Sequence, residues 1–264
     1  MKRIVFLVCA MTILATACER SPKSPANALR VNTITVEDSV QFPPEALEDW
    51  MFDDMAYYLT EVDVPVTDNE ELRDNIIQWI SDFLSPNYDG DSQDVKEMVE
   101  FDKDEFLDPN LGSPQSNLQN LINLVEDNDH YVTYICDSYL YTGGVHGSSL
   151  KEGASFLKTD GTRFTYELFK DPDALAGMIK DGIESQYFME TLDGTEMTFE
   201  EAIVEEALDD FPMPMSEPWI ENDSIFFIYM TYEISAYSLG MPQCGFPYQM
   251  LKDHLTPKGL SFFE

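Results

Sequence analysis

The chain of 264 residues carries 15 basic and 50 acidic residues, which gives a formal net charge of -35 at neutral pH. A surface this acidic repels nucleic acid and anionic lipid head groups, so neither is an expected partner. Hydrophobic residues make up 44% of the chain and aromatic residues 12%, which is enough to bury a core and excludes a disordered polypeptide.

The N-terminus has the order of a bacterial export signal. Lys2 and Arg3 form a positive start, an apolar stretch follows, and small residues precede Cys18. The apolar stretch, of about eleven residues, is too short to span a bilayer. We therefore predict a lipoprotein signal peptide over residues 1–17, lipid attachment at Cys18 and a location in the cell envelope, with the lipid as the sole membrane contact. The alternatives are an ordinary secreted protein and an uncleaved anchor.

Residues 18–30 contain Ser-Pro repeats and no periodic apolar residues, which predicts a flexible tether. Short strands are expected at 31–36 and 59–66. Thr67 and Glu70 then have the spacing of a capping box, the signature of a helix start. The helix it opens should end before Pro86, and its apolar residues recur every three or four positions: Leu72, Ile76, Trp79, Ile80 and Phe83.

The next segment has weaker signals. Residues 87–114 are acidic and lack a clear period, so we expect mostly loop with one helical turn. The spacing of Leu118, Leu121, Ile122 and Val125 predicts a second helix. Together with the preceding elements, it completes a predicted N-terminal α/β subdomain over residues 31–128.

The remaining residues, 129–264, form the predicted C-terminal domain. Strands are expected at 131–141 and 225–234, and a hairpin at 155–166 around Asp160-Gly161. Helices are expected after Asp171-Pro172 and after a capping box of Thr198 with Glu201, and a last one at 248–255. The fold class is α+β, with a central, mainly antiparallel sheet that includes 131–141, 155–166 and 225–234, and with helices packed on it.

Cysteines define no metal or redox motif. Of the two outside the export segment, Cys136 and Cys244, the spacing leaves open a disulfide or two buried free thiols. Three histidines without metal-ligand spacing argue against a zinc site, and an acidic loop at 89–100 lacks the glycine of a calcium loop. We expect neither a metal nor another cofactor.

The most unusual local sequence is TGGVHG at residues 142–147, where three glycines surround His146. Glycines suit a tight turn with positive φ, so His146 is expected on a sharply folded loop after a strand. It is either a functional residue near neutral pH or a structural one that ties the loop to its own backbone. No nucleophile elbow or phosphate-binding loop accompanies it, so we do not expect an enzyme.

The second half of the chain, from about residue 131 to 255, resembles the RsiV-type domain of unknown function. The resemblance rests on residues 139–147, 158–161, 167–169 and 232–240. The first half is similar to the domain that commonly precedes it, called PdaC-type here, through residues 62–65 and the helix that follows. The PdaC-type domain also occurs in a peptidoglycan deacetylase, outside the catalytic part of that enzyme.

The resemblance implies a non-catalytic ligand-binding module, because one relative is an anti-sigma factor whose outer domain is a receptor for lysozyme. We predict a ligand-facing edge at the loops after Tyr141 and Tyr237. Its expected contributors are Gly143, Gly144, His146, Tyr232, Glu233 and Tyr237.

Three hypotheses stay open. The chain binds a basic protein such as lysozyme, or a cell-wall component, as its charge and the resemblance suggest. It acts on peptidoglycan or another glycan with His146 and nearby carboxylates. Or it is a purely structural envelope lipoprotein, whose acidic surface serves solubility alone.

Overall fold

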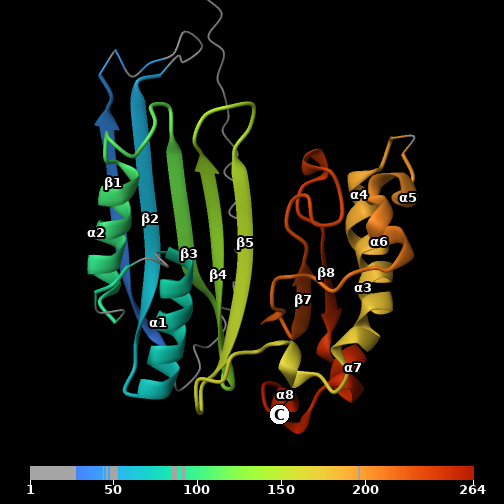
Figure 1. The fold of residues 1–264 in the computed structure, drawn as a ribbon. Helices are drawn as coiled ribbons and strands as arrows, with labels where there is room; N and C mark the ends of the chain where they lie inside the picture. The colour runs from blue at the N-terminus through green and yellow to red at the C-terminus, as the bar shows by residue number, and fades with distance from the viewer. Residues whose placement is uncertain are drawn as a thin grey trace, which may run out of the picture.

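The computed structural model describes residues 28–43, 45, 47, 53–84, 88–90, 93–195 and 197–264. The predicted signal peptide at 1–17 and Cys18 lie outside the described residues, as does most of the predicted tether at 18–30. The α+β class is confirmed, because one five-stranded and one three-stranded sheet are packed with helices (Figure 1). None of the helices in the described ranges combines the length and the hydrophobicity that a membrane span requires.

The larger sheet has its strands in chain order, and every neighbouring pair is antiparallel except the parallel pair β2 and β3. The predicted subdomain boundary at residues 128–129 falls in the turn between β3 and β4, so this sheet continues across it. The strands are β1 (Arg30–Gln41), β2 (Met55–Val66), β3 (Asn117–Asp127), β4 (Tyr131–Tyr141) and β5 (Ser148–Leu157).

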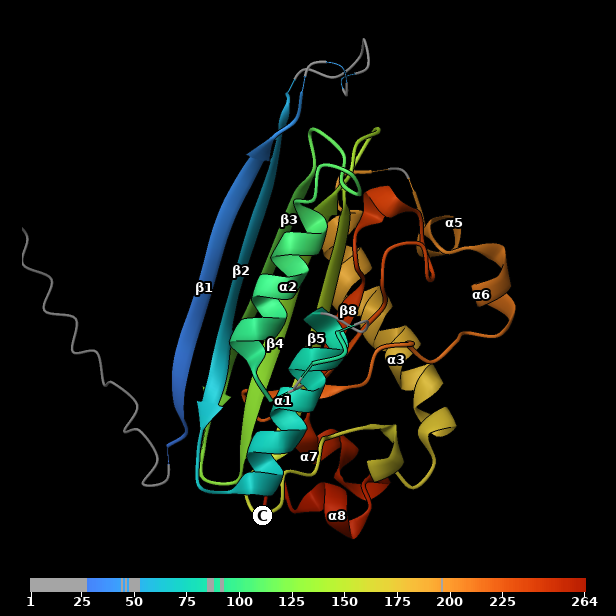
Figure 2. The same cartoon turned by 60° about the vertical axis from the view of Figure 1, so that its left-hand side comes forward.

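Helices α1 (Glu70–Leu84) and α2 (Val95–Phe106) cover one face of this sheet (Figure 2). They lie in the crossover that a parallel strand pair requires. The predicted apolar stripe of α1 is confirmed, with Ile76 and Ile80 fully buried. The predicted capping residue is wrong: Asn69, and not Thr67, accepts the amide hydrogen of Leu72 at 3.2 Å.

Two further predictions for this half are wrong. Residues 95–106 form α2 where a loop was expected, and the Asp94 carboxylate caps the helix by accepting from Glu97 N at 3.0 Å. Residues 117–127 form β3 where a helix was expected. Asn120 is the reason, because this buried polar residue occupies an inward position and hides the strand alternation. Its amide is satisfied across the sheet by Ser138 Oγ at 2.7 Å.

The smaller sheet lies between β5 and the helices of the C-terminal half (Figure 1). Its strands are β6 (Trp219–Glu221), β7 (Ser224–Ile228) and β8 (Gln243–Pro247). The helices are α3 (Ala176–Gly182), α4 (Met189–Thr191), α5 (Phe199–Ala202), α6 (Glu205–Asp209), α7 (Tyr248–Leu251) and α8 (Pro257–Leu260).

The predicted helix after Asp171-Pro172 is confirmed, because a 3-10 turn at Pro172–Leu175 leads into α3 and a π-helical turn at Ile183–Phe188 continues it to α4. The capping box of Thr198 with Glu201 is also confirmed. The helix it starts is interrupted after Ala202, because Ile203 adopts an extended conformation and bridges to Ser235.

Three predictions for the C-terminal half need correction. The predicted strand at 225–234 leaves its sheet after Ile228, and it belongs to the smaller sheet and not beside β4. The turn at Asp160-Gly161 exists, with Gly161 at φ 68°, but its second arm contributes one isolated bridge, Phe156 to Arg163. The end of α7 is followed by a 3-10 turn at Lys252–His254, so the last predicted helix is shorter than expected.

The two halves join where β6 packs on β4 and β5, on the face opposite α1 and α2. Two buried hydroxyl groups there form hydrogen bonds with the backbone of Ile220 on β6. Thr133 Oγ1 donates to Ile220 O at 2.7 Å, and Ser155 Oγ accepts from Ile220 N at 2.8 Å. Trp219 lies beside them, fully buried, against Gly153. Cys136 and Cys244 are free and buried in different core clusters, so the alternative of two free thiols is the one observed.

Candidate functional site

The loop at residues 142–147, between β4 and β5, turns sharply at two glycines. Gly143 and Gly144 have φ values of 97° and 98°, which side chains with a Cβ rarely adopt. Tyr141 Oη donates to the carbonyl oxygen of Gly144 at 2.9 Å and closes the turn. The chain then presents Val145 to solvent, 97% exposed, and directs His146 back toward the C-terminal half.

His146 stacks on Tyr237, with ring centroids 3.9 Å apart and planes inclined by 17°. Tyr237 lies in a second loop, residues 229–242, which connects β7 to β8. Its hydroxyl donates to the carbonyl oxygen of Gly147 at 2.8 Å. The stacked pair therefore fastens a loop of the larger sheet to a loop of the smaller one.

The hydrogen bonds of His146 determine which ring nitrogen carries the proton. Nδ1 lies 3.0 Å from the carbonyl oxygen of Gly147, which can only accept, so Nδ1 is the donor. In the neutral ring Nε2 is then an acceptor, and Tyr232 Oη lies 3.3 Å from it. The Tyr232 hydroxyl therefore donates to the imidazole.

The backbone of Tyr232 has a conformation that glycine adopts more easily than any other residue. Its φ is 70°, a left-handed value that is costly for a bulky residue. Its ring centroid lies 5.7 Å from that of Tyr237, and its side chain is 62% exposed. We call His146, Tyr232 and Tyr237 the aromatic cluster, a rigid group with one open side.

Glu233 is not brought to His146. Its two carboxylate oxygens accept backbone N–H groups of Met215 at 2.8 Å and Met230 at 2.7 Å. Desolvation raises the pKa of Glu233, and these two amides counteract part of the effect. The carboxylate thus connects the second loop to the segment before β6.

The arrangement suits binding better than proton transfer. In the part of the chain that the structure describes, the hydrogen-bond partners of the His146 ring are a backbone carbonyl and a phenol, and no carboxylate contacts it. Rigid aromatic residues with a polar tip are typical of recognition surfaces. Of the residues predicted for the ligand-facing edge, Gly143, Gly144, His146, Tyr232 and Tyr237 gather here and Glu233 does not. The described residues also contain no cluster of three potential metal ligands.

The sequence did not predict a cleft on the helix-covered face of the larger sheet. It has a volume of about 490 Å³, and residues of α1, α2, β3, β4 and β5 line it together with Arg163. We call it the helix-side cleft. Its residues come from six segments far apart in the chain, so no local motif could have indicated it.

One carboxyl group of the helix-side cleft is strongly perturbed. Burial raises the pKa of Asp102 to about 6, although Tyr58 Oη donates to it at 2.8 Å. The folded protein therefore holds this proton more tightly than the unfolded chain. The stability contributed by this group falls as the pH rises from about 4 to about 6.

Replacement Asp102→Asn is expected to stabilise the protein by about 1–2 kcal/mol near neutral pH, because it removes a desolvated charge and keeps an acceptor for Tyr58. The difference from the unchanged chain should vanish near about pH 4, where the folded protein holds Asp102 protonated. Urea denaturation of both chains across this range measures it. A variant that is less stable at neutral pH would contradict the assignment.

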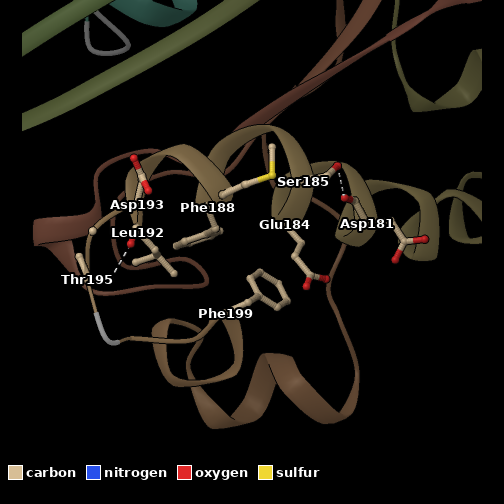
Figure 3. A pocket seen from close by; sticks show the side chains of 10 residues that line it. Asp181, Glu184, Ser185, Phe188, Leu192, Asp193, Thr195 and Phe199 are labelled. Carbon is tan, nitrogen blue, oxygen red and sulfur yellow. Dashed lines mark hydrogen bonds between the residues drawn. The ribbon is translucent and has the colours of Figure 1, made fainter.

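A second hollow, of about 650 Å³, lies between the helical run at 172–191 and α5. Figure 3 shows Phe188 and Leu192 on one side and Phe199 facing them, with Glu184 directed into the same space. Asp181 and Asp193 stand at its two ends (Figure 3). An apolar floor with acidic ends accepts apolar or cationic groups and repels anions.

The fold occurs in two bacterial proteins of known structure. A member of the DUF3298 family from Bacteroides fragilis NCTC 9343 superposes with a TM-score of 0.62 at 17% identity, over 90% of this chain and 97% of that one. A DUF3298 family protein from Pseudomonas aeruginosa PAO1 gives a TM-score of 0.53 at 15% identity, over 88% and 96%. The sequence matches no protein-family model and no curated protein. The chain therefore shares its fold with bacterial domains of unknown function.

Proposed function

We propose that this protein is a lipid-anchored binding module of the bacterial cell envelope, without catalytic activity of its own, which recognises a basic protein of the lysozyme type. The observation that carries the proposal is the aromatic cluster, exposed on one side and fixed by hydrogen bonds and stacking. Interfaces draw much of their affinity from such preorganised aromatic residues.

The charge of the chain supports the same partner. A net charge of -35 accelerates encounter with a cationic protein and disfavours an anionic one. The hollow in Figure 3, with its acidic ends, is a second place where a cationic side chain with an apolar stem fits. The RsiV-type and PdaC-type resemblances and the anchor at Cys18 belong to this proposal.

Purified lysozyme is expected to bind the full-length protein at low ionic strength, and binding should weaken with added salt because screening acts on exposed charges. Surface-immobilised protein and biolayer interferometry measure this. Tyr232→Ala and His146→Ala should each weaken binding about tenfold or more, as truncation of a central interface residue does.

Phe101→Ala is the matched control, because Phe101 is an exposed aromatic residue on α2, on the other side of the larger sheet. It should leave the affinity unchanged. Absence of binding at low salt, or equal binding by all variants, would contradict the proposal.

Two outcomes would favour the other hypotheses. Turnover of cell-wall fragments that His146→Ala abolishes without lowering the melting temperature would indicate a glycan-acting enzyme. Loss of envelope integrity on deletion, with neither lysozyme nor cell-wall fragments bound, would indicate a structural lipoprotein.

A further inference from the structure

The helix-side cleft exists because α1 and α2 leave part of the larger sheet uncovered. Residues of β3, β4 and β5 that point to the helix side form its floor. Leu118 on β3 lies opposite Leu140 on β4. Asn120 on β3 lies opposite Ser138 on β4, which in turn lies opposite Leu150 on β5. The end of α1 forms one wall with Phe83 and Leu84. The floor and this wall are largely apolar, and the polar groups lie around them.

Two N–H donors in the cleft have no acceptor. Arg163 Nε and Trp79 Nε1 are inaccessible to solvent, and neither has a hydrogen-bond partner in the described structure. Both residues line the cleft. A buried donor without a partner loses its hydrogen bonds to water and gains none in return, so native structures rarely keep one without a reason.

The charge around Arg163 is also incomplete. Desolvation lowers the pKa of its guanidinium, while Glu152, Glu217 and Asp82 counteract that effect. No carboxylate lies within ion-pair distance of Arg163 in the described part of the chain. The half-exposed Arg73, by contrast, contacts Asp74 at 2.9 Å. The guanidinium is thus attracted by acidic residues but bound by none.

These groups define the chemistry of a ligand. The guanidinium of Arg163 has Nε and Nη donors in the planar fork that binds a carboxylate, and the indole N–H of Trp79 is a third donor in the lining of the cleft. Asp82 and Glu152 line the same cleft and require a cationic group. A simple anion would be repelled by these carboxylates, and a simple cation by Arg163. A zwitterion satisfies both, and the leucine residues of the cleft suit an apolar side chain.

We propose that the helix-side cleft binds a small zwitterion with an apolar side chain, an α-amino acid or a short peptide, whose carboxylate lies at Arg163 and Trp79 and whose ammonium group lies toward Asp82 and Glu152. This site is separate from the aromatic cluster. It accounts for the two buried N–H donors of the cleft, Arg163 Nε and Trp79 Nε1, that have no acceptor in the described structure.

Isothermal titration of the full-length protein in detergent with L-leucine and with leucyl-leucine tests the proposal and distinguishes the free amino acid from the peptide. A dissociation constant of about 1 mM or lower is expected for one of them. Leucinamide, which lacks the carboxylate, and N-acetyl-leucine, which lacks the ammonium group, should each bind at least about tenfold more weakly.

Arg163→Gln should weaken binding at least about tenfold. Arg73→Gln is the matched control, because it removes the same charge from a half-exposed position on α1 outside the lining of the cleft, and it should leave binding unchanged. Asp82→Asn is a second variant that tests the site if Arg163→Gln fails to fold. Asp82 is exposed, so its replacement is not expected to disturb the fold. It should weaken L-leucine binding and leave the melting temperature unchanged.

Failure of both probes to bind at about 10 mM would overturn the proposal. Equal binding of leucinamide and N-acetyl-leucine, or full binding by Arg163→Gln, would show an apolar patch without zwitterion recognition and would also overturn it. Neither result bears on lysozyme binding at the aromatic cluster.

Discussion

Replacing Gly153 by alanine is expected to lower the free energy of unfolding by about 3 kcal/mol. Gly153 lies on β5, and a Cβ at this position would stand 2.2 Å from Cγ and 2.4 Å from Cδ2 of Trp219. The indole cannot move away easily, because it is 1% exposed and stacked on Phe226 at 5.5 Å. The added methyl group must therefore push β6 away from the larger sheet.

Thermal and urea denaturation of Gly153→Ala measure the loss, and the near-ultraviolet circular dichroism of Trp219 should change with it. Gly177→Ala is the control, because a Cβ there meets no heavy atom within 4 Å. It should be neutral or stabilising by less than about 1 kcal/mol, as expected for an unstrained helical glycine. Equal stability of the two variants would mean that Trp219 does not pack against Gly153.

Removing the hydroxyl of Ser155 should destabilise the protein by about 2–3 kcal/mol. Ser155 Oγ is the acceptor for Ile220 N, and in Ser155→Ala this buried N–H loses its partner. Thr133→Val removes the donor to Ile220 O and should cost a similar amount. The two hydroxyls lie 2.7 Å apart, so their effects should not be additive in the double variant.

Double-mutant analysis by urea denaturation measures this coupling. Ser148→Ala and Thr35→Val are the controls, because both side chains are exposed on strands of the same sheet. Each should change the free energy of unfolding by less than about 0.5 kcal/mol. Additive losses at Ser155 and Thr133 would show that the hydroxyls act independently.

Both predictions concern the junction that assembles the candidate site. His146 belongs to the larger sheet and Tyr237 to the connection within the smaller one, so their stacking depends on how β6 sits against β4 and β5. A variant that loosens this junction should weaken the lysozyme binding that we propose, without changing a residue of the aromatic cluster.

The sequence predicted the elements whose signals are local. The stripe of α1, the proline-initiated run into α3 and the capping box at Thr198 each depend on residues within a few positions, and each is present. The turn at Gly143 and Gly144 was predictable for the same reason, since positive φ is a property of single residues.

Elements whose pattern is set by distant partners were not predictable. Asn120 lies in the core because Ser138, on the next strand, donates a hydrogen bond to its side-chain amide. The sequence alone does not show this partner, so a polar residue at position 120 looks like an interruption of a strand. The strand predicted at 225–234 ends early because Tyr229 N donates to Pro242 O, but Pro242 has no N–H to return the bond, so the pairing with β8 stops there. Pairwise contacts of this kind leave no local trace.

The candidate site divides in the same way. The glycine loop and His146 were found from composition, and Tyr232 and Tyr237 from the family resemblance. The placement of Glu233 required the structure, because only the structure shows that its oxygens are occupied by Met215 N and Met230 N. The helix-side cleft had no sequence signal at all.

The tautomer of His146 has a consequence for what the aromatic cluster offers a partner. Both nitrogens of its ring are occupied inside the protein, Nδ1 by the carbonyl oxygen of Gly147 and Nε2 by the hydroxyl of Tyr232. The hydroxyl hydrogen of Tyr237 is likewise donated to Gly147 O. The oxygen of Tyr232 keeps a lone pair, so the cluster can accept a hydrogen bond from a partner but has no hydroxyl or ring N–H left to donate to one.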